Sequence, residues 1–288
     1  MIIGFIAVVG LIIGLVSLGI ININPIQIAT YFTITICICI ALYFCYLLLF
    51  AGLNQTEKKQ IIICFILLIT AALFWSAFEQ KPTSFNLFAQ DFTDRQFFGF
   101  EIPAVWFQSI NPLFIIIFAP IIAWLWVKLR KQNRDPSYIT KFIIALLLTA
   151  GGFLVMSIAI ASYLITQNGG TVSALWIASS LLLLTLGELC LSPVGLSTMT
   201  KLAPTIIRGQ VMGLWFTASA LGNLMAGLIG GHVSINEVDQ LPLLFVRCVI
   251  ALLLGALVLW LMKKSIRKLL NQTSTPSQKS LDIQLEKV

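Results

Sequence analysis

Charged side chains are scarce in this sequence of 288 residues. Asp, Glu, Lys and Arg together make up 10% of it, whereas apolar residues make up 59%. The mean hydropathy is accordingly +0.98. A soluble protein with so little charge could not cover its surface, whereas lipid solvates apolar side chains directly. The composition therefore excludes an ordinary soluble domain and indicates a membrane protein.

Histidine is nearly absent too, because His232 is the only one, and no cysteine lies at a metal-binding spacing from it. The six cysteines all fall within apolar stretches, at positions 37, 39, 45, 64, 190 and 248. We interpret them as small packing residues, and expect no disulfide framework, no metal site and no cofactor. The apolar segments also lack an Asp pair and a Ser–His constellation, so an enzyme with catalytic residues is not expected.

Long apolar runs make up most of what is present. A membrane-crossing helix needs about 20 mostly apolar residues. Eight segments meet this condition: 2–22, 27–52, 61–80, 103–128, 138–166, 171–200, 207–231 and 242–262. They are too long for barrel strands and lack the alternation of such strands. The third has apolar residues beyond Pro82 and could extend to Ala89. The sequence predicts an all-α transmembrane protein of about eight spans in the lipid bilayer.

The positions of the basic residues predict the orientation. If the first segment begins in the cytoplasm, all but three of the 18 Lys and Arg residues fall in cytoplasmic connections or the carboxy-terminal tail. The three exceptions are Lys81, Arg95 and Arg247. Cytoplasmic loops of membrane proteins are enriched in Lys and Arg. We therefore expect both termini in the cytoplasm, and no nucleic-acid partner despite the net charge of +7.

The two ends of the chain differ from the spans between them. No Lys or Arg precedes the first apolar segment, and the first basic residue is Lys58. A signal peptide would begin with a basic region, so this start is typical of the interior of a longer membrane protein. Residues 271–288 are polar and rich in Ser, Thr and Gln, and we expect them to be a disordered tail.

One acid stands out because it falls far inside an apolar segment. Glu188 lies about 17 residues into the segment 171–200, which places it near the bilayer midplane at 1.5 Å per residue. Pro193 follows and is expected to kink this helix, and Ser192 precedes it. Polar groups beside a broken helix mark binding sites in transporters. The alternative is a neutral carboxyl that is buried and hydrogen-bonded within the bundle.

A second acid, Glu79, falls near the end of the third apolar segment. If the helix continues to Ala89, Glu79 lies inside the membrane. If the helix ends at Gln80, Glu79 is an interfacial carboxylate beside Lys81. Trp75 precedes Glu79 by about one helical turn, so the two side chains share a face. The sequence favours neither a pocket role nor plain packing for Trp75.

Four short motifs resemble the proton-dependent oligopeptide transporter family, a branch of the major facilitator superfamily. They occur in the family's order, from its seventh to its eleventh core helix: Phe74-Trp-Ser-Ala-Phe-Glu-Gln80, Phe107-Gln-Ser-Ile-Asn-Pro-Leu-Phe114, Gly187-Glu-Leu-Cys-Leu-Ser-Pro-Val-Gly-Leu-Ser197 with Thr200-Lys-Leu-Ala-Pro204, and Gly209-Gln-Val-Met-Gly-Leu-Trp-Phe216. The first two spans are similar to the extra hairpin that bacterial members carry between their two six-helix halves. The resemblance covers most of the chain, but only the second half of the family's architecture.

The resemblance implies roles for particular residues. Glu79 is similar to the family's proton-coupling acid, and Glu188 to the acid that receives the amino terminus of the peptide. The implied substrate-binding residues are Trp75, Gln108, Asn111, Glu188, Ser192, Trp215 and Phe216. In the family, an arginine and a lysine of the amino-terminal half pair with the two acids. No basic residue lies deep in a span to replace them here, and Arg247 is the nearest candidate.

The resulting hypothesis is half of a proton-coupled symporter of di- and tripeptides in the bacterial inner membrane. Its expected domains are a linker hairpin at 1–52, a six-helix half at 53–270 and the tail. Its expected partners are protons, peptides and a missing amino-terminal six-helix half, without which we expect no transport. A carrier of another small solute in the same superfamily and a membrane scaffold that does not transport remain alternatives.

Overall fold

The structure is a computed structural model that describes residues 24–166, 170–231 and 240–273. The expected first span at 2–22, His232 and residues 274–288 of the expected tail lie outside these ranges. Within them, seven helices are long and apolar enough to cross a membrane. They coincide with the second to the eighth of the expected spans. The prediction of an all-α transmembrane fold is therefore confirmed.

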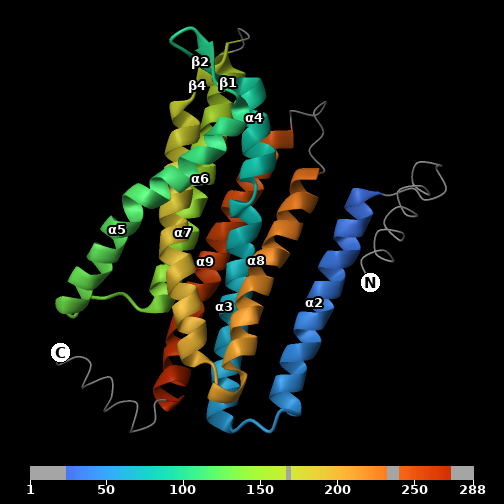
Figure 1. Cartoon of the computed structure of the whole chain (residues 1–288), viewed down its shortest axis with the longest axis vertical. Helices are drawn as coiled ribbons and strands as arrows, with labels where there is room; N and C mark the ends of the chain where they lie inside the picture. Colours follow the sequence, from blue (N-terminus) through green and yellow to red (C-terminus); the bar gives the residue numbers. More distant parts are fainter. Residues whose placement is uncertain (1–23, 167–169, 232–239, 274–288) are drawn as a thin grey trace, which may run out of the picture.

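The order of the elements follows the chain through long helices and a few short strands (Figure 1). Their bounds are α2 Pro25–Leu49, α3 Gln55–Phe78, η1 Lys81–Phe85, α4 Asn86–Phe92, β1 Thr93–Asp94, β2 Gln96–Phe97, β3 Phe100–Glu101, η2 Ala104–Ser109, α5 Ile110–Lys131, α6 Tyr138–Thr166, β4 Val172–Ser173, α7 Leu175–Leu202, η3 Thr205–Ile207, α8 Arg208–Gly231 and α9 Gln240–Thr273.

The turn between α2 and α3 ends one helix and starts the next with local signals. Gly52 adopts a positive φ of 66° just after α2, a conformation that favours glycine. Asn54 then forms a capping box with Glu57, in which each side chain accepts a hydrogen bond of 2.9 Å from the other residue's backbone N–H. Such a box satisfies backbone donors that the first turn leaves unpaired. The sequence thus fixes where α3 begins.

The third span continues past Pro82, as the sequence allowed. Helices α3, η1 and α4 form one span over Gln55–Phe92. Pro82 has no N–H to donate, and the chain widens at this point into a π-helical turn, where the Phe85 N–H donates to the Gln80 carbonyl at 3.2 Å. A wider turn changes which side chains face the neighbouring helices. In the wider turn Lys81 contacts Asn111, and not Glu79, which was one of the two alternatives that the sequence left open.

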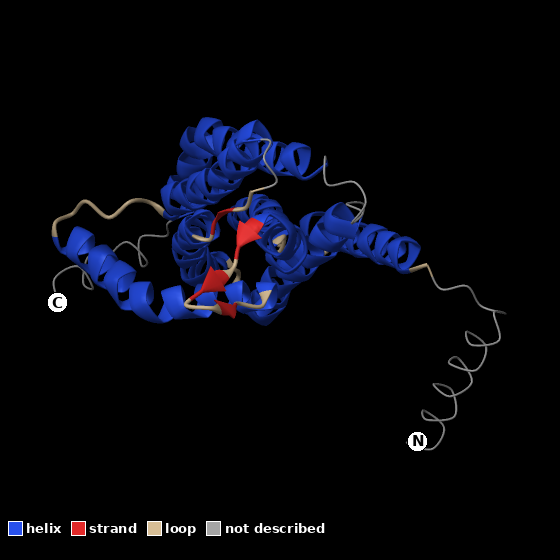
Figure 2. Cartoon of the chain, turned by 90° about the horizontal axis from the view of Figure 1, so that it is seen from above, coloured by secondary structure: helices blue, strands red, loops and turns tan. Residues whose placement is uncertain are grey.

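The helices pack unequally around the core (Figures 1 and 2). Helix α6 packs most extensively against α7 and α9, and α3 packs against α8 and α9. Helix α5 diverges from the bundle in Figure 1, and the only residue that it buries is Asn111. Helix α2 lies at the other margin, where it packs mainly on α8 and Tyr43 donates a hydrogen bond to Gln210.

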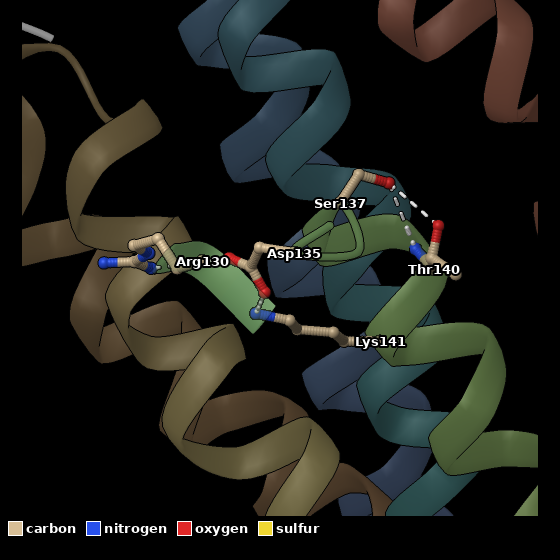
Figure 3. Close-up of polar contacts among 5 residues, drawn as sticks. All are labelled: Arg130, Asp135, Ser137, Thr140 and Lys141. Carbon is tan, nitrogen blue, oxygen red and sulfur yellow. Dashed lines mark hydrogen bonds and ion pairs between the residues drawn. The ribbon is translucent and has the colours of Figure 1, made fainter. Parts of the chain in front are cut away.

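Short strands close one end of the bundle. Strand β1 pairs in parallel with β4, and β2 pairs with β3 in a hairpin. Within this end Arg95 contacts Glu101 at 2.6 Å and donates to the Ile102 carbonyl at 2.9 Å. At the opposite end, in the α5–α6 connection, Asp135 contacts both Lys141 at 2.7 Å and Arg130 at 3.5 Å (Figure 3).

Candidate functional site

A polar cluster joins three spans at Asn111. The Asn111 side chain is 8% exposed and lies in the first turn of α5. Its Nδ2 donates to Thr185 Oγ1 at 2.9 Å and to Glu188 Oε2 at 3.2 Å, both on α7. Its Oδ1 accepts a hydrogen bond of 3.0 Å from Lys81 Nζ in η1. Two of the residues expected at a substrate site, Asn111 and Glu188, are therefore in direct contact.

The neighbours of Asn111 fix the direction of its amide. The Thr185 hydroxyl donates to the Leu181 carbonyl at 2.7 Å, so its oxygen is left to accept a proton from Asn111. An ammonium group can only donate, so Lys81 requires the carbonyl oxygen of the amide. Both neighbours impose the same orientation. The NH2 group must then face Glu188, whose oxygen serves as an acceptor.

Lys81 corrects the sequence interpretation. We expected no basic residue within a span near the two acids, but Lys81 lies in the continuous span Gln55–Phe92 and reaches the Asn111–Glu188 pair. Its ammonium also lies 3.3 Å from the centroid of the Phe78 ring, a cation–π contact. The sequence left open whether the helix ends at Gln80 or continues, and because it continues through the π-helical turn, Lys81 lies within the span and contacts Asn111.

Glu79 lies at the junction of α3 and η1. It is half-buried, and its backbone N–H donates to the Trp75 carbonyl at 2.9 Å. Within the described residues its carboxylate forms no hydrogen bond and no ion pair within 4 Å, including with Lys81. The interfacial reading of Glu79, as a helix-end carboxylate paired with Lys81, therefore does not hold, because the helix continues and Lys81 binds Asn111 instead.

Gln80 is a polar residue that the sequence interpretation missed. Its side chain is fully buried and donates to the carbonyls of Ser76, at 3.3 Å, and Ala226, at 3.2 Å. Its Oε1 accepts hydrogen bonds from Thr83 at 3.2 Å and Ser84 at 2.9 Å. Its amide group thus links α3 and the π-helical turn to α8, through the Ala226 carbonyl. Gln80 holds the segment that carries Glu79 and Lys81 in place.

The expected aromatic residues take three different positions. Trp75 is half-buried, and its ring centroid lies 5.3 Å from that of Phe78. Helix α8 passes close to Trp75 at Gly222, where an added Cβ would lie 2.4 Å from Trp75 Cβ. Trp215 is 4% exposed and packs on Phe142, and its ring fills the space in front of Gly195. Phe216 is 60% exposed on α8.

The remaining expected residues lie around this cluster without direct contact to Asn111. Gln108 is exposed in η2, one turn before α5. Ser192 is half-buried on α7, four residues after Glu188, and Pro193 lies exposed inside α7, which continues without interruption to Leu202. Thr185 was not expected here, although it precedes Glu188 by three residues, a spacing that places both on one helix face.

A small cavity lies beside the cluster, which it touches only at Lys81. This cavity, lined by Asn86, Phe107, Gln108 and Ile177 among others, has a volume of about 10 Å³. Sites for small molecules usually span roughly 300–1,000 Å³. This cavity is therefore too small to hold a peptide.

Comparison with known proteins accounts for this arrangement. A protein-family model, described as the POT family, matches residues 27–244 of this chain. The chain is 58% identical over 267 residues to the peptide transporter YePEPT of Yersinia enterocolitica, covering 93% of this chain and 52% of that protein. It is 30% identical to the di-/tripeptide transporter of Lactococcus lactis, covering 80% of this chain and 45% of that one.

Solved structures agree with the sequence relatives. A crystal structure of the peptide transporter POT in complex with sulfate matches with a TM-score of 0.79 and 31% identity, over 93% of this chain and 52% of that one. The chain thus spans about half the length of the relatives that it matches. The resemblance drawn from the four motifs is confirmed: this membrane-spanning chain belongs to the POT family of transporters.

Proposed function

We propose that this chain forms the carboxy-terminal half of a proton-coupled symporter of di- and tripeptides. The observation that carries the proposal is the contact between Asn111 and Glu188 inside the membrane span. Asn111 donates to only one oxygen of the Glu188 carboxylate, so the other oxygen is left to accept from a primary ammonium, the group that every peptide with a free amino terminus carries. The names of the relatives, which are peptide transporters, support this choice of substrate.

Glu79 is the proposed proton-coupling residue. It lies in the same span as Lys81, which attracts it at longer range, but within the described residues its carboxylate has no hydrogen-bonding or ion-pair partner within 4 Å. An intramembrane acid without a partner is costly as an anion, so its protonation state responds to whatever charge approaches it. A basic residue of an amino-terminal half, present in one conformation and withdrawn in another, would exchange with a proton on Glu79.

The aromatic residues divide between wall and support. Trp75 and Phe216 would provide apolar walls that tolerate varied peptide side chains, because neither is fully buried. Trp215 would act from behind, by filling the space at Gly195 of α7 and so holding the helix that carries Glu188 and Ser192. Gln108 would contact a ligand only from the rim, since it is exposed beside α5.

The proposed organisation follows the family pattern. Residues 1–52 would form the linker hairpin, residues 53–270 the six-helix half and residues 271–288 a tail. Both termini would lie in the cytoplasm of a bacterial cell, with the protein in the inner membrane. Rocking of this half against an amino-terminal six-helix half around the Asn111–Glu188 pair would give alternating access. Alkaline phosphatase fusions after Lys59 and after Glu101 would test the orientation, with activity expected only for the second.

Uptake by a reassembled transporter tests the function. The chain would be produced together with the amino-terminal six helices of the Yersinia relative in cells that lack peptide transporters, and accumulation of radiolabelled dialanine measured. We expect uptake only when both halves are present, and loss of proton-driven uptake in E79Q and of dialanine binding in E188Q. K128Q serves as control, because Lys128 contacts Trp124 on α5, away from the cluster.

The outcome separates the alternatives. Uptake of another labelled solute that dialanine does not compete against would favour a different substrate class. A chain that associates with the other half but supports no uptake of any solute would favour a scaffold. Proton-driven uptake that persists in E79Q would contradict the role assigned to Glu79.

A further inference from the structure

A second concave region lies away from the Asn111–Glu188 pair, between α8 and α9. Both helices pack against α3, but they contact each other at most marginally. The space between them is a crevice of about 580 Å³ with α3 as its floor. It is lined by Leu73, Ser76, Ala77, Ile229, Gln240, Leu243, Leu244, Arg247, Cys248, Ala251 and Leu252.

The crevice has a closed end and a wider end. At the closed end α9 approaches α3 at Gly255, where an added Cβ would lie 2.4 Å from Leu73 Cδ2. Towards the start of α9 the walls are Ile229 and Leu243, which are 40% and 49% exposed. The crevice is therefore accessible at this end, and its lining is mostly apolar, with Ser76, Gln240 and Arg247 among its polar residues.

Arg247 is the only charged residue in the lining. It is exposed, and it lies seven residues after the start of α9, about 10 Å along the helix at 1.5 Å per residue. No acid lines the crevice, and no described residue forms an ion pair or hydrogen bond with the Arg247 side chain. A guanidinium inside a span is costly unless an anion or the headgroup region compensates it.

We propose that this crevice binds one anionic phospholipid, with its phosphate on Arg247 and an acyl chain along the crevice towards Ala251 and Leu73. The charge of Arg247 selects the anion, since a guanidinium binds phosphate oxygens with two parallel hydrogen bonds. The apolar lining matches a hydrocarbon chain, and the volume falls within the roughly 300–1,000 Å³ of known small-molecule sites. Basic pockets between transmembrane helices bind lipid headgroups in this way.

The site bears on the proposed transport without depending on it. The floor of the crevice, at Ser76 and Ala77, belongs to the same helix that ends at Glu79. A lipid wedged between α8 and α9 would fill a gap in the packing of that helix. The lipid site can exist whether or not the chain transports peptides, so the two proposals fail separately.

Native mass spectrometry of the purified, delipidated chain tests the proposal. Dioleoylphosphatidylglycerol or dioleoylphosphatidylcholine would be added back and the retained lipid counted. We expect one tightly held phosphatidylglycerol on the wild type and weaker retention of phosphatidylcholine. R247Q should weaken phosphatidylglycerol binding about tenfold, R247K should weaken it less, and A251F, which fills the crevice, should weaken both lipids.

Two controls keep the result interpretable. K128Q removes another exposed cation, near the end of α5, and should leave phosphatidylglycerol binding in the crevice unchanged. Thermal unfolding of each variant establishes that it is folded. Equal retention by wild type and R247Q, or no effect of A251F, would overturn the proposal. So would a loss of stability in lipid-free R247Q with unchanged lipid retention, because Arg247 would then pair with a carboxylate of the chain itself.

Discussion

Helices α5 and α6 are neighbours in the sequence, but they are held in opposite ways. Helix α6 packs along α7 and α9 through fully buried apolar residues such as Phe153 and Met156. Helix α5 buries only Asn111, and its exposed side chains include Ile116 and Ile117. Apolar packing over a whole helix fixes α6, whereas a polar contact near one end helps to anchor α5. The apolar contacts of α6 therefore hold the bundle together, whereas the polar contact of α5 belongs to the candidate site.

The largest effect is expected in the apolar region. The Phe153 ring lies 5.4 Å from that of Phe85 and 6.1 Å from that of Phe245, so Phe153→Ala would leave a cavity among three helical segments. We expect the free energy of unfolding to fall by about 3 kcal/mol, the low end of the range for buried Phe, because lipid solvates exposed apolar surface better than water does. Thermal unfolding in detergent measures it.

The adjacent residue provides the control for this prediction. Leu154 is 50% exposed on the same helix, so Leu154→Ala removes a side chain that lipid or detergent can replace. Its expected cost is well below that of Phe153→Ala. Similar costs for the two variants would show that burial within the described residues does not determine how α6 is held.

An intermediate effect is expected at the anchor of α5. Asn111→Leu keeps the approximate volume, but it leaves Lys81 without its acceptor and Glu188 and Thr185 without their donor. Because buried polar groups that lose a hydrogen bond remain shielded from water, we expect the unfolding free energy to fall by about 2 kcal/mol. Gln108→Leu, at an exposed position before the same helix, should cost little. Equal costs would mean that the polar cluster does not anchor α5.

The sequence predicted the spans well because each is a long apolar run, a signal that does not depend on tertiary contacts. It also indicated Glu188, since an acid deep in such a run needs a partner, whereas Asn111 was indicated by the resemblance to the family. It did not indicate that Lys81 would join them. Whether the chain passes Pro82 as a straight helix or as a π-helical turn depends on the Gln80 contacts with α8, and these form only in the folded bundle.

For Trp215 too, the sequence did not reveal which neighbours its side chain contacts in the folded bundle. Its position in a motif suggested a pocket wall, whereas in the structure its ring occupies the space at Gly195 and contacts Phe142. The face that a helical residue presents depends on how its helix is rotated against its neighbours. A single sequence does not fix how α7 and α8 are rotated against each other.

A smaller effect is expected for the coupling of charges within the polar cluster. Lys81→Met should leave Glu188 without a nearby cation, and Glu188→Gln should remove one of the two carboxylates that attract Lys81, whereas the double variant removes both charges. We therefore expect the double variant to be more stable than the sum of the single effects implies, by about 1 kcal/mol. Lys128→Met combined with Glu188→Gln should be additive, because Lys128 lies against Trp124. An additive result for Lys81 would contradict charge coupling through Asn111.

The smallest effect is expected in the loop between the two helices, where Asp135 contacts two cations of different exposure (Figure 3). Arg130 is 76% exposed and lies 3.5 Å from Asp135, so Arg130→Gln should change the free energy of unfolding by less than about 0.5 kcal/mol. Lys141, at 2.7 Å, is nearly buried and also lies over the Trp126 ring, so Lys141→Gln should cost more. Thermal unfolding at low and high salt separates the two, because salt screens an exposed pair more than a buried one.

An Arg130→Gln cost equal to that of Lys141→Gln would mean that Asp135 holds α5 to α6 through both cations alike. The end of α5 would then be anchored at the loop as well as at Asn111.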